Sequence, residues 1–236
     1  MKKKSIEKNA AKVIFTTQFK SAYQMTSSGK SFTKFVDYTD RDEAVELDMK
    51  REAIKDSKYK DFGGFVEYMD RDSATSVDAK GRKLTSNFNS FTDHLTKDEV
   101  QELKDNLNKA QKNNSNIYSN LVSFSTKFLK ENGIYDDKDN SLNQDALREI
   151  IRNSMGSYID STPLKNPIWW GDIHVNTNHI HVHIGMTEIN PTTPEVIVGD
   201  HKEHRGKLPE YSFNVFKHQV VQKTLMFSKS RTKDLD

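Results

Sequence analysis

The sequence predicts an α+β fold in which helices flank a mostly antiparallel central sheet that carries a histidine-rich hairpin. Two observations support this prediction. Strand-like and helical segments follow one another in the order strand, helices, strand, helix, hairpin, short strand, helix, an order typical of α+β folds. Four of the eight histidines also fall within ten residues, in a stretch with the period of two that a strand shows. We expect a single domain over residues 1–236, with any further C-terminal region absent.

Composition narrows the class of protein. The chain carries 36 basic and 34 acidic residues, so its net charge of +2 does not by itself indicate a nucleic-acid partner. Two stretches are nevertheless basic, residues 1–12 and 202–233. The absence of cysteine excludes disulfides and thiolate metal sites. Because no apolar run approaches a membrane span or a signal peptide, we expect a soluble cytoplasmic protein without membrane insertion.

The N-terminal third is expected to contain a strand, a helix and a duplicated motif. Residues 12–19 have the β-branched and aromatic content of a strand. After a polar loop, Ser31 can cap a helix with an apolar stripe. Residues 35–44 return as residues 65–74, at an offset of 30 residues, and two copies are too few for a solenoid. Two interpretations of the duplicated motif stay open. It is either a helix end stabilised by a salt bridge between Arg and Asp, or a site at which a tyrosine acts as a nucleophile.

The middle of the chain is expected to be mainly helical. Residues 76–93 are polar and predict a loop, whereas residues 96–99 have the capping-box pattern that opens a helix. Residues 117–125 have the character of a strand. A second capping-box pattern at residues 141–144 predicts the start of a helix that continues through Tyr158.

The elements that follow the histidine-rich stretch are shorter until the last helix. Residues 185–188 complete a strand, and residues 195–198 add a short neighbouring strand. A charged loop is expected over residues 199–206. Residues 213–227 then predict a basic amphipathic helix.

The histidine-rich stretch at residues 169–184 predicts a hairpin with a defined register. Histidine alternates with Ile and Val from His179 onward, and the polar residues 176–178 suit a tight turn. A loop with an even number of residues places His174 opposite His181 and Asp172 opposite His183. The apolar residues of both strands then share the other face.

Three imidazoles on one face of such a hairpin predict a metal site. Opposed side chains in an antiparallel pair have Cβ atoms about 4.5–5.5 Å apart, close enough for the side chains of His174, His181 and His183 to meet at one ion. Neutral imidazoles suit a divalent first-row metal, and three protein ligands leave positions open for water or substrate. The alternative is an exposed histidine-rich strand that binds no metal.

At these residues the chain resembles the HUH endonucleases, and among them the conjugative relaxases of the Mob type (MobP/MobL-like). His181-Val182-His183 is similar to their His-hydrophobe-His core, with the third ligand, His174, seven residues earlier. His179 stands where these relaxases often have histidine, and Asn176 stands where many have Asp. The resemblance makes Asp172, His179 and Asn176 the candidates for orienting the ligand histidines or for acting as a base.

The resemblance implies a metal-dependent DNA strand transferase. Such a relaxase nicks single-stranded transfer-origin DNA of a plasmid or integrative element, with Mn²⁺ or Mg²⁺ as cofactor, and a tyrosine forms a 5′-phosphotyrosine link. Phe35-Val36-Asp37-Tyr38 resembles the motif of the nucleophile, so Tyr38 is the first candidate and Tyr68, in the second copy, the next. The implied partners are accessory DNA-binding proteins and a type IV secretion coupling protein.

Four residues are candidates for contacts with DNA. Leu121-Val122-Ser123-Phe124 resembles the second relaxase motif, whose Ser contacts DNA beside the nick. The basic residues Arg205, Lys207 and Lys217 can hold the DNA backbone.

Two other functions remain open at this stage. A replication initiator of the HUH group would use the same hairpin. A cupin-like small-molecule metalloenzyme would use His181 and His183 with Glu188 as a further ligand.

Overall fold

The computed structural model describes residues 12–27, 87–136, 138, 141–174 and 180–233. Several predictions fall outside these residues. They are the helix after Ser31, the duplicated motif with Tyr38 and Tyr68, and the turn that contains Asn176 and His179. These stay predictions.

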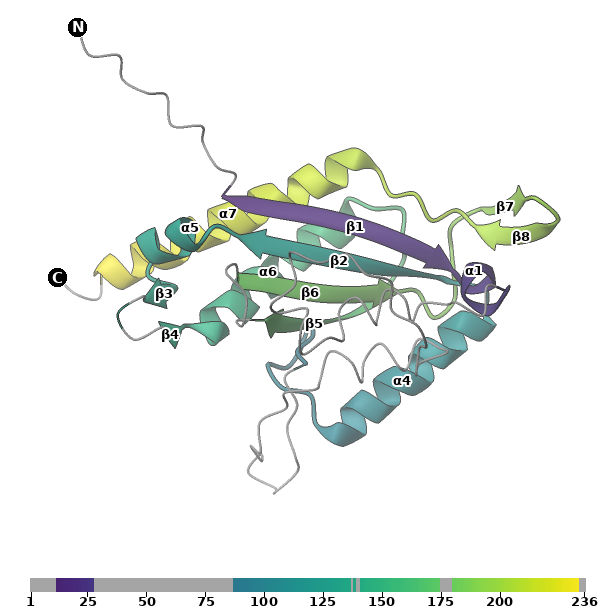
Figure 1. Cartoon of the computed structure of the whole chain (residues 1–236), viewed down its shortest axis with the longest axis horizontal. Helices are drawn as coiled ribbons and strands as arrows, with labels where there is room; N and C mark the ends of the chain where they lie inside the picture. Colours follow the sequence, from purple (N-terminus) through teal and green to yellow (C-terminus); the bar gives the residue numbers. More distant parts are fainter. Residues whose placement is uncertain (1–11, 28–86, 137, 139–140, 175–179, 234–236) are drawn as a thin grey trace, which may run out of the picture.

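A four-stranded sheet forms the centre of the fold (Figure 1). Its strands are β1 (Val13–Ser21), β2 (Asn116–Phe124), β5 (Ile168–His174) and β6 (Ile180–Thr187), in the spatial order β1-β2-β6-β5. Every neighbouring pair is antiparallel. The α+β class, the antiparallel sheet and the strands expected at residues 12–19 and 117–125 are therefore confirmed.

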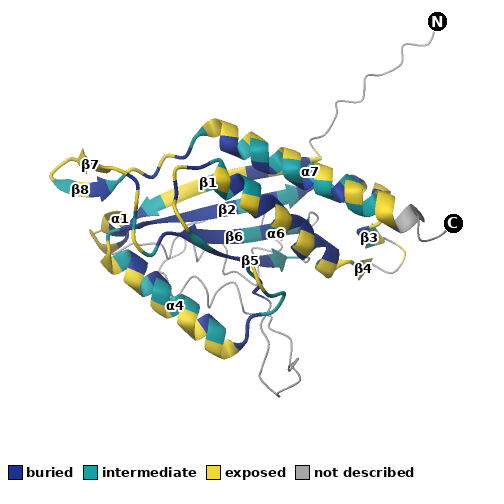
Figure 2. Cartoon of the chain, turned by 180° about the vertical axis from the view of Figure 1, so that it is seen from behind, coloured by how far each residue is buried: buried dark blue, intermediate teal, exposed yellow. Residues whose placement is uncertain are grey.

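Two long helices cover one face of this sheet, which we call the helix-covered face. Helices α6 (Gln144–Asp160) and α7 (Glu210–Lys233) lie behind the sheet in Figure 1 and in front of it in Figure 2. Their buried residues, such as Tyr158 and Phe216, join Phe15, Val182 and Ile184 of the sheet in the larger apolar core. The alternation of β6 thus buries its Val and Ile residues as the sequence predicted.

The opposite face carries the histidines, and at one end it is covered by α4 (Lys97–Lys112). A smaller apolar core there contains Trp170 together with Leu107 and Val100. Adjacent side chains in a strand point to opposite faces, so Trp169 belongs to the larger core and Trp170 to the smaller one. Through the two tryptophans, β5 therefore packs against the apolar cores on both faces of the sheet.

The predicted start of α4 is confirmed, whereas that of α6 is wrong by two residues. Thr96 caps α4 with the reciprocal bonds of a capping box, in which Glu99 Oε2 accepts from the Thr96 backbone N–H at 2.7 Å. Ser141 does not cap α6, because Ser141–Leu142 forms strand β4, paired with β3 (Tyr135–Asp136). The cap is Asn143, whose Oδ1 accepts from the Ala146 N–H at 3.0 Å.

Other elements were not predicted. Short helices α1 (Ala22–Ser27) and α5 (Thr126–Glu131) follow β1 and β2 directly. Phe88, in the segment expected to be a loop, exchanges two backbone hydrogen bonds with Gly171 at the outer edge of β5. None of the described helices combines the length and the hydropathy of a membrane-spanning segment.

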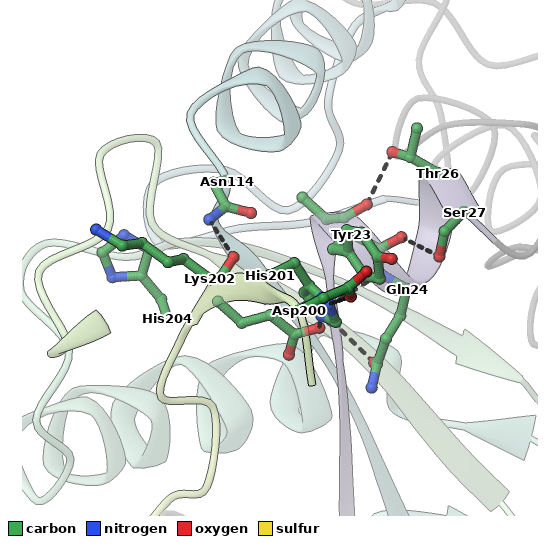
Figure 3. A network of polar contacts seen from close by, with 12 residues as sticks. Tyr23, Gln24, Thr26, Ser27, Asn114, Asp200, His201, Lys202 and His204 are labelled. Atoms are coloured by element: carbon green, nitrogen blue, oxygen red, sulfur yellow. Dashed lines mark hydrogen bonds and ion pairs between the residues drawn. The ribbon is translucent and has the colours of Figure 1, made fainter. Parts of the chain in front are cut away.

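Half of the charged loop expected at residues 199–206 is a strand. Strand β7 (Glu195–Val198) forms where a strand was predicted, but it pairs with β8 (His201–His204) in a separate two-stranded sheet and not beside β6. Gly199 takes a positive φ of 64° in the tight turn between β7 and β8. Figure 3 shows how β8 is attached to the main domain: the His201 ring stacks on Tyr23 with centroids 3.3 Å apart, and Asn114 Nδ2 donates to the Lys202 carbonyl.

Candidate functional site

The histidines lie where β5 ends and β6 begins. His174 pairs with His181 and Asp172 pairs with His183 across the two strands, which is the register predicted from the sequence. Paired residues of neighbouring strands share one face of a sheet, so these four side chains form one cluster on the face opposite to α6 and α7. We call this the histidine cluster.

The side chains of the cluster are close to one another. The ring centroids of His174 and His183, which are diagonal neighbours, are 4.5 Å apart. His174 Nε2 lies 3.6 Å from Asp172 Oδ2, and the Asp172 side chain is only 6% exposed. Asp172 Oδ1 also accepts a hydrogen bond from the Ile173 N–H at 2.9 Å. A buried carboxylate therefore sits beside the imidazoles, and the role of Asp172 in orienting them stays a prediction.

Electrostatics favour a neutral His183. Burial disfavours its charged form, and positive charge on His174 or His181 would disfavour it further, so the pKa of His183 lies well below its usual range. A neutral imidazole has a free lone pair, which is the form that binds a cation.

Strand β2 adds a residue to the cluster. Ser123 pairs with His181 on the side away from β5, and its Oγ lies 2.8 Å from His181 Nδ1. The sequence had suggested Ser123 as a DNA contact, and the structure does bring it to the histidines. The hydrogen bond itself was missed, because nothing local links two residues 58 positions apart.

The basic candidates lie elsewhere. Lys217 is on α7, which packs on the helix-covered face. Arg205 and Lys207 are exposed and follow β8 in the chain. The residue before Arg205 is His204, whose carbonyl accepts a hydrogen bond from the Asn116 side chain at the start of β2. That end of β2 is opposite to the end that holds Ser123. The structure therefore does not bring these three side chains together with the histidines.

Two of the tyrosines with described side chains are unsuited to attack at the cluster. Tyr118 and Tyr158 are buried in the larger core, on the other face of the sheet. Burial raises the pKa of Tyr158 to about 12, so its phenol is harder to ionise. Both tyrosines are therefore packing residues of the larger core.

Glu188, which the cupin interpretation required as a metal ligand, is used in another way. Its carboxylate accepts from the Lys165 N–H at 2.6 Å, the Thr192 hydroxyl at 2.6 Å and the Thr192 N–H at 3.1 Å. It is buried and fixes the loop after β6. Together with the long helices, this arrangement argues against the cupin alternative.

The imidazole nitrogens of the cluster are donors that suit a divalent metal, but the three rings do not surround a common point. Among the residues that the structure describes, no three His, Asp or Glu side chains are grouped as the ligands of a metal ion. The backbone nevertheless places three imidazoles on adjacent positions of two strands, and His183 is held neutral.

The antiparallel sheet, with paired helices on one face and clustered imidazoles on the other, defines an α+β protein in which two strands of the sheet carry the candidate site. The family follows from comparison with known proteins. The model of the MobL relaxases matches residues 11–234, and the chain belongs to this family of DNA-nicking enzymes. The resemblance to Mob-type relaxases is thus confirmed. Neither the curated proteins nor the solved structures gave a match.

Proposed function

We propose that this relaxase nicks one strand of transfer-origin DNA at a specific site, using a metal ion held by His174, His181 and His183. The register of β5 and β6 carries the proposal, because it places these three histidines and Asp172 on one face. Membership of the MobL relaxases favours a transfer origin over the replication origin of an initiator protein.

Mn²⁺ or Mg²⁺ is the expected ion, and when bound it would neutralise charge on the phosphate that is cleaved. The protein has three tasks at this site. The histidines would supply ring-nitrogen donors, burial of His183 disfavours its protonated form, and Asp172 lies beside His174 on the same strand, where it can orient the ring. His179 and Asn176, which belong to the turn predicted from the sequence, are further candidates for orienting a ligand or for accepting a proton.

Tyr38 is proposed as the nucleophile, with Tyr68 as the alternative. A free phenol has a pKa of about 10, so the tyrosine must lose its proton to a nearby base as it attacks. The phenolic oxygen then forms a bond to phosphorus, the bond from phosphorus to the 3′ oxygen breaks, and the 3′ oxygen leaves with a proton. The phosphotyrosine keeps the energy of the broken ester, so religation is possible.

DNA outside the cluster is proposed to contact Arg205, Lys207 and Lys217. Because these residues lie far from the histidines, they would bind the DNA backbone flanking the nick rather than the reacting phosphate. Accessory DNA-binding proteins and a secretion coupling protein are the expected partners of the nicked complex.

The proposed chemistry can be tested with Mn²⁺ and labelled single-stranded transfer-origin DNA, by looking for a covalent adduct on a denaturing gel. The wild-type protein should form the adduct, whereas His181→Ala and His183→Ala should not. Tyr38→Phe should bind DNA without forming adduct, because Phe keeps the ring but removes the nucleophile.

Tyr68→Phe is the matched control and should keep most of the adduct. The opposite pattern would make Tyr68 the nucleophile, and an adduct that survives in the double variant would rule out both. Undiminished cleavage by His183→Ala would rule out the metal site.

A further inference from the structure

Ser123 and His181 are joined across two central strands of the sheet. They are direct partners in the pairing of β2 with β6, and the Ser123 hydroxyl lies 2.8 Å from the ring nitrogen Nδ1. Both side chains are partly buried. A hydrogen bond of this length, at a site partly removed from water, restrains the ring of His181.

The position of this bond on the ring determines what the rest of the ring can do. Nδ1 is the nitrogen nearer the backbone, so holding it leaves Nε2 as the nitrogen that can bind a ligand. A neutral imidazole carries one proton. If the proton is on Nδ1 and is donated to Ser123 Oγ, then Nε2 has the lone pair that a metal requires.

We propose that Ser123 is a positioning residue that holds His181 in the tautomer with the proton on Nδ1, and so directs Nε2 to the metal. This inference rests on the proposed metal site. It replaces the role of DNA contact that the sequence suggested for Ser123. Metal-binding histidines commonly donate their second N–H to a fixed acceptor, which sets both tautomer and ring orientation.

His174 and His183 have other neighbours than the hydroxyl group that lies beside His181. His174 has the carboxylate of Asp172 at 3.6 Å, and His183 is flanked across the strands by Asp172 and by the apolar Leu121. A hydroxyl orients His181 without adding negative charge on the β2 side of the cluster. The polyanionic substrate therefore meets less repulsion there than a second carboxylate would cause.

The tautomer can be measured without metal and without DNA. In ¹⁵N spectra of the metal-free protein at a pH where the ring is neutral, His181 should have its proton on Nδ1. In Ser123→Ala the proton should move toward Nε2, the form that an unrestrained imidazole favours. Ser123→Thr, which keeps the hydroxyl and suits a strand, should restore the wild-type tautomer.

Binding of Mn²⁺ alone, measured by calorimetry, is the second readout. Ser123→Ala should weaken it by about 10–100-fold, while Ser123→Thr should stay close to wild type. Ser119→Ala is the matched control, because Ser119 is on the same strand and the same face but pairs with Gly185 rather than with a histidine. It should leave Mn²⁺ binding unchanged, and thermal melting should show that all three variants fold.

The outcomes separate this inference from the metal site on which it rests. If His183→Ala weakens Mn²⁺ binding but Ser123→Ala changes neither binding nor tautomer, the metal site stands and the role of Ser123 is refuted. If Ser123→Ala weakens single-stranded DNA binding in EDTA and leaves Mn²⁺ affinity intact, Ser123 is a DNA contact instead. If His183→Ala does not affect Mn²⁺ binding, the metal site is wrong and the inference falls with it.

Discussion

Replacing Gly185 by Ala should destabilise the protein strongly, because Trp170 occupies the place of the new methyl group. Gly185 and Trp170 are partners across β5 and β6, and the indole ring lies over the glycine. A Cβ added at Gly185 would come within 2.1, 2.3 and 2.5 Å of three Trp170 ring atoms. Contacts this short cannot persist, so the ring or the strand must move.

The ring has little room to move. Trp170 is fully buried, in the smaller core against residues such as Leu107 and Ile117. Overpacking of a core usually costs about 1–3 kcal/mol, and three simultaneous clashes point to the upper end, about 3 kcal/mol. For a chain of this size each kcal/mol lowers Tm by about 2–4 °C, so Gly185→Ala should melt about 6–12 °C below wild type.

Gly156→Ala is the matched control. Gly156 lies inside α6 with no atom near its missing Cβ. Ala favours a helix over Gly by about 0.5–1 kcal/mol, so this variant should melt slightly above wild type. Thermal unfolding followed by circular dichroism gives both values.

A double variant tests the cause. In a Trp170→Phe background, where the ring is smaller, Gly185→Ala should cost less than in the wild type, by a coupling energy of about 0.5–3 kcal/mol. If Gly185→Ala melts with the wild-type protein, the indole is not fixed over the glycine. If the costs of the two changes simply add, the destabilisation has another origin.

Three further predictions concern other parts of the chain. Asn143→Ala should cost about 0.5–2 kcal/mol in urea unfolding, because it removes the cap of α6, whereas Ser141→Ala should cost much less; equal costs would contradict the assignment of the cap. Partial burial lowers the pKa of His201, but its hydrogen bonds to Glu203 and Asp200 outweigh this effect, so the pKa is raised overall. The stabilisation that protonated His201 provides is therefore complete below about pH 6.5 and is lost as the pH rises through the raised pKa. Hydrogen exchange at β8 should therefore speed up with pH beyond its chemical rate, and His201→Gln should remove this dependence; an unchanged profile would refute it. Removing Arg205, Lys207 or Lys217 should each lower the salt dependence of single-stranded DNA binding by about 0.7 in logarithmic slope, and an unchanged slope would show that the residue makes no phosphate contact.

Local patterns in the sequence were sufficient to predict most strands of the sheet and the face on which the histidines lie. Side chains alternate strictly along a strand, so parity alone decided that His174, His181 and His183 share a face with Asp172. The capping box at Thr96 could be predicted for the same reason, since both partners lie within one turn. The motif around the histidines was also sufficient to identify the family.

Competition between local structures could not be resolved from the sequence. Ser141 and Asn143 are both good caps for the same helix, and the pairing of β4 with β3 decided in favour of Asn143. In the same way, residues 201–204 are charged and resemble a loop, yet they form β8 because β7 offers a partner and Tyr23 a surface to stack on.

Only the tertiary structure decided the contacts between residues far apart in the chain. The hydroxyl of Ser123 meets His181 because β2 lies beside β6, an order of strands that no local pattern specifies. The Glu188 carboxylate accepts hydrogen bonds from Lys165 and Thr192, in two different loops, and so is not available as a metal ligand. Lys217 lies on the other side of the sheet from the histidines. Periodicity determines which way a side chain points, since that depends on its own backbone, whereas what it meets depends on how distant segments pack.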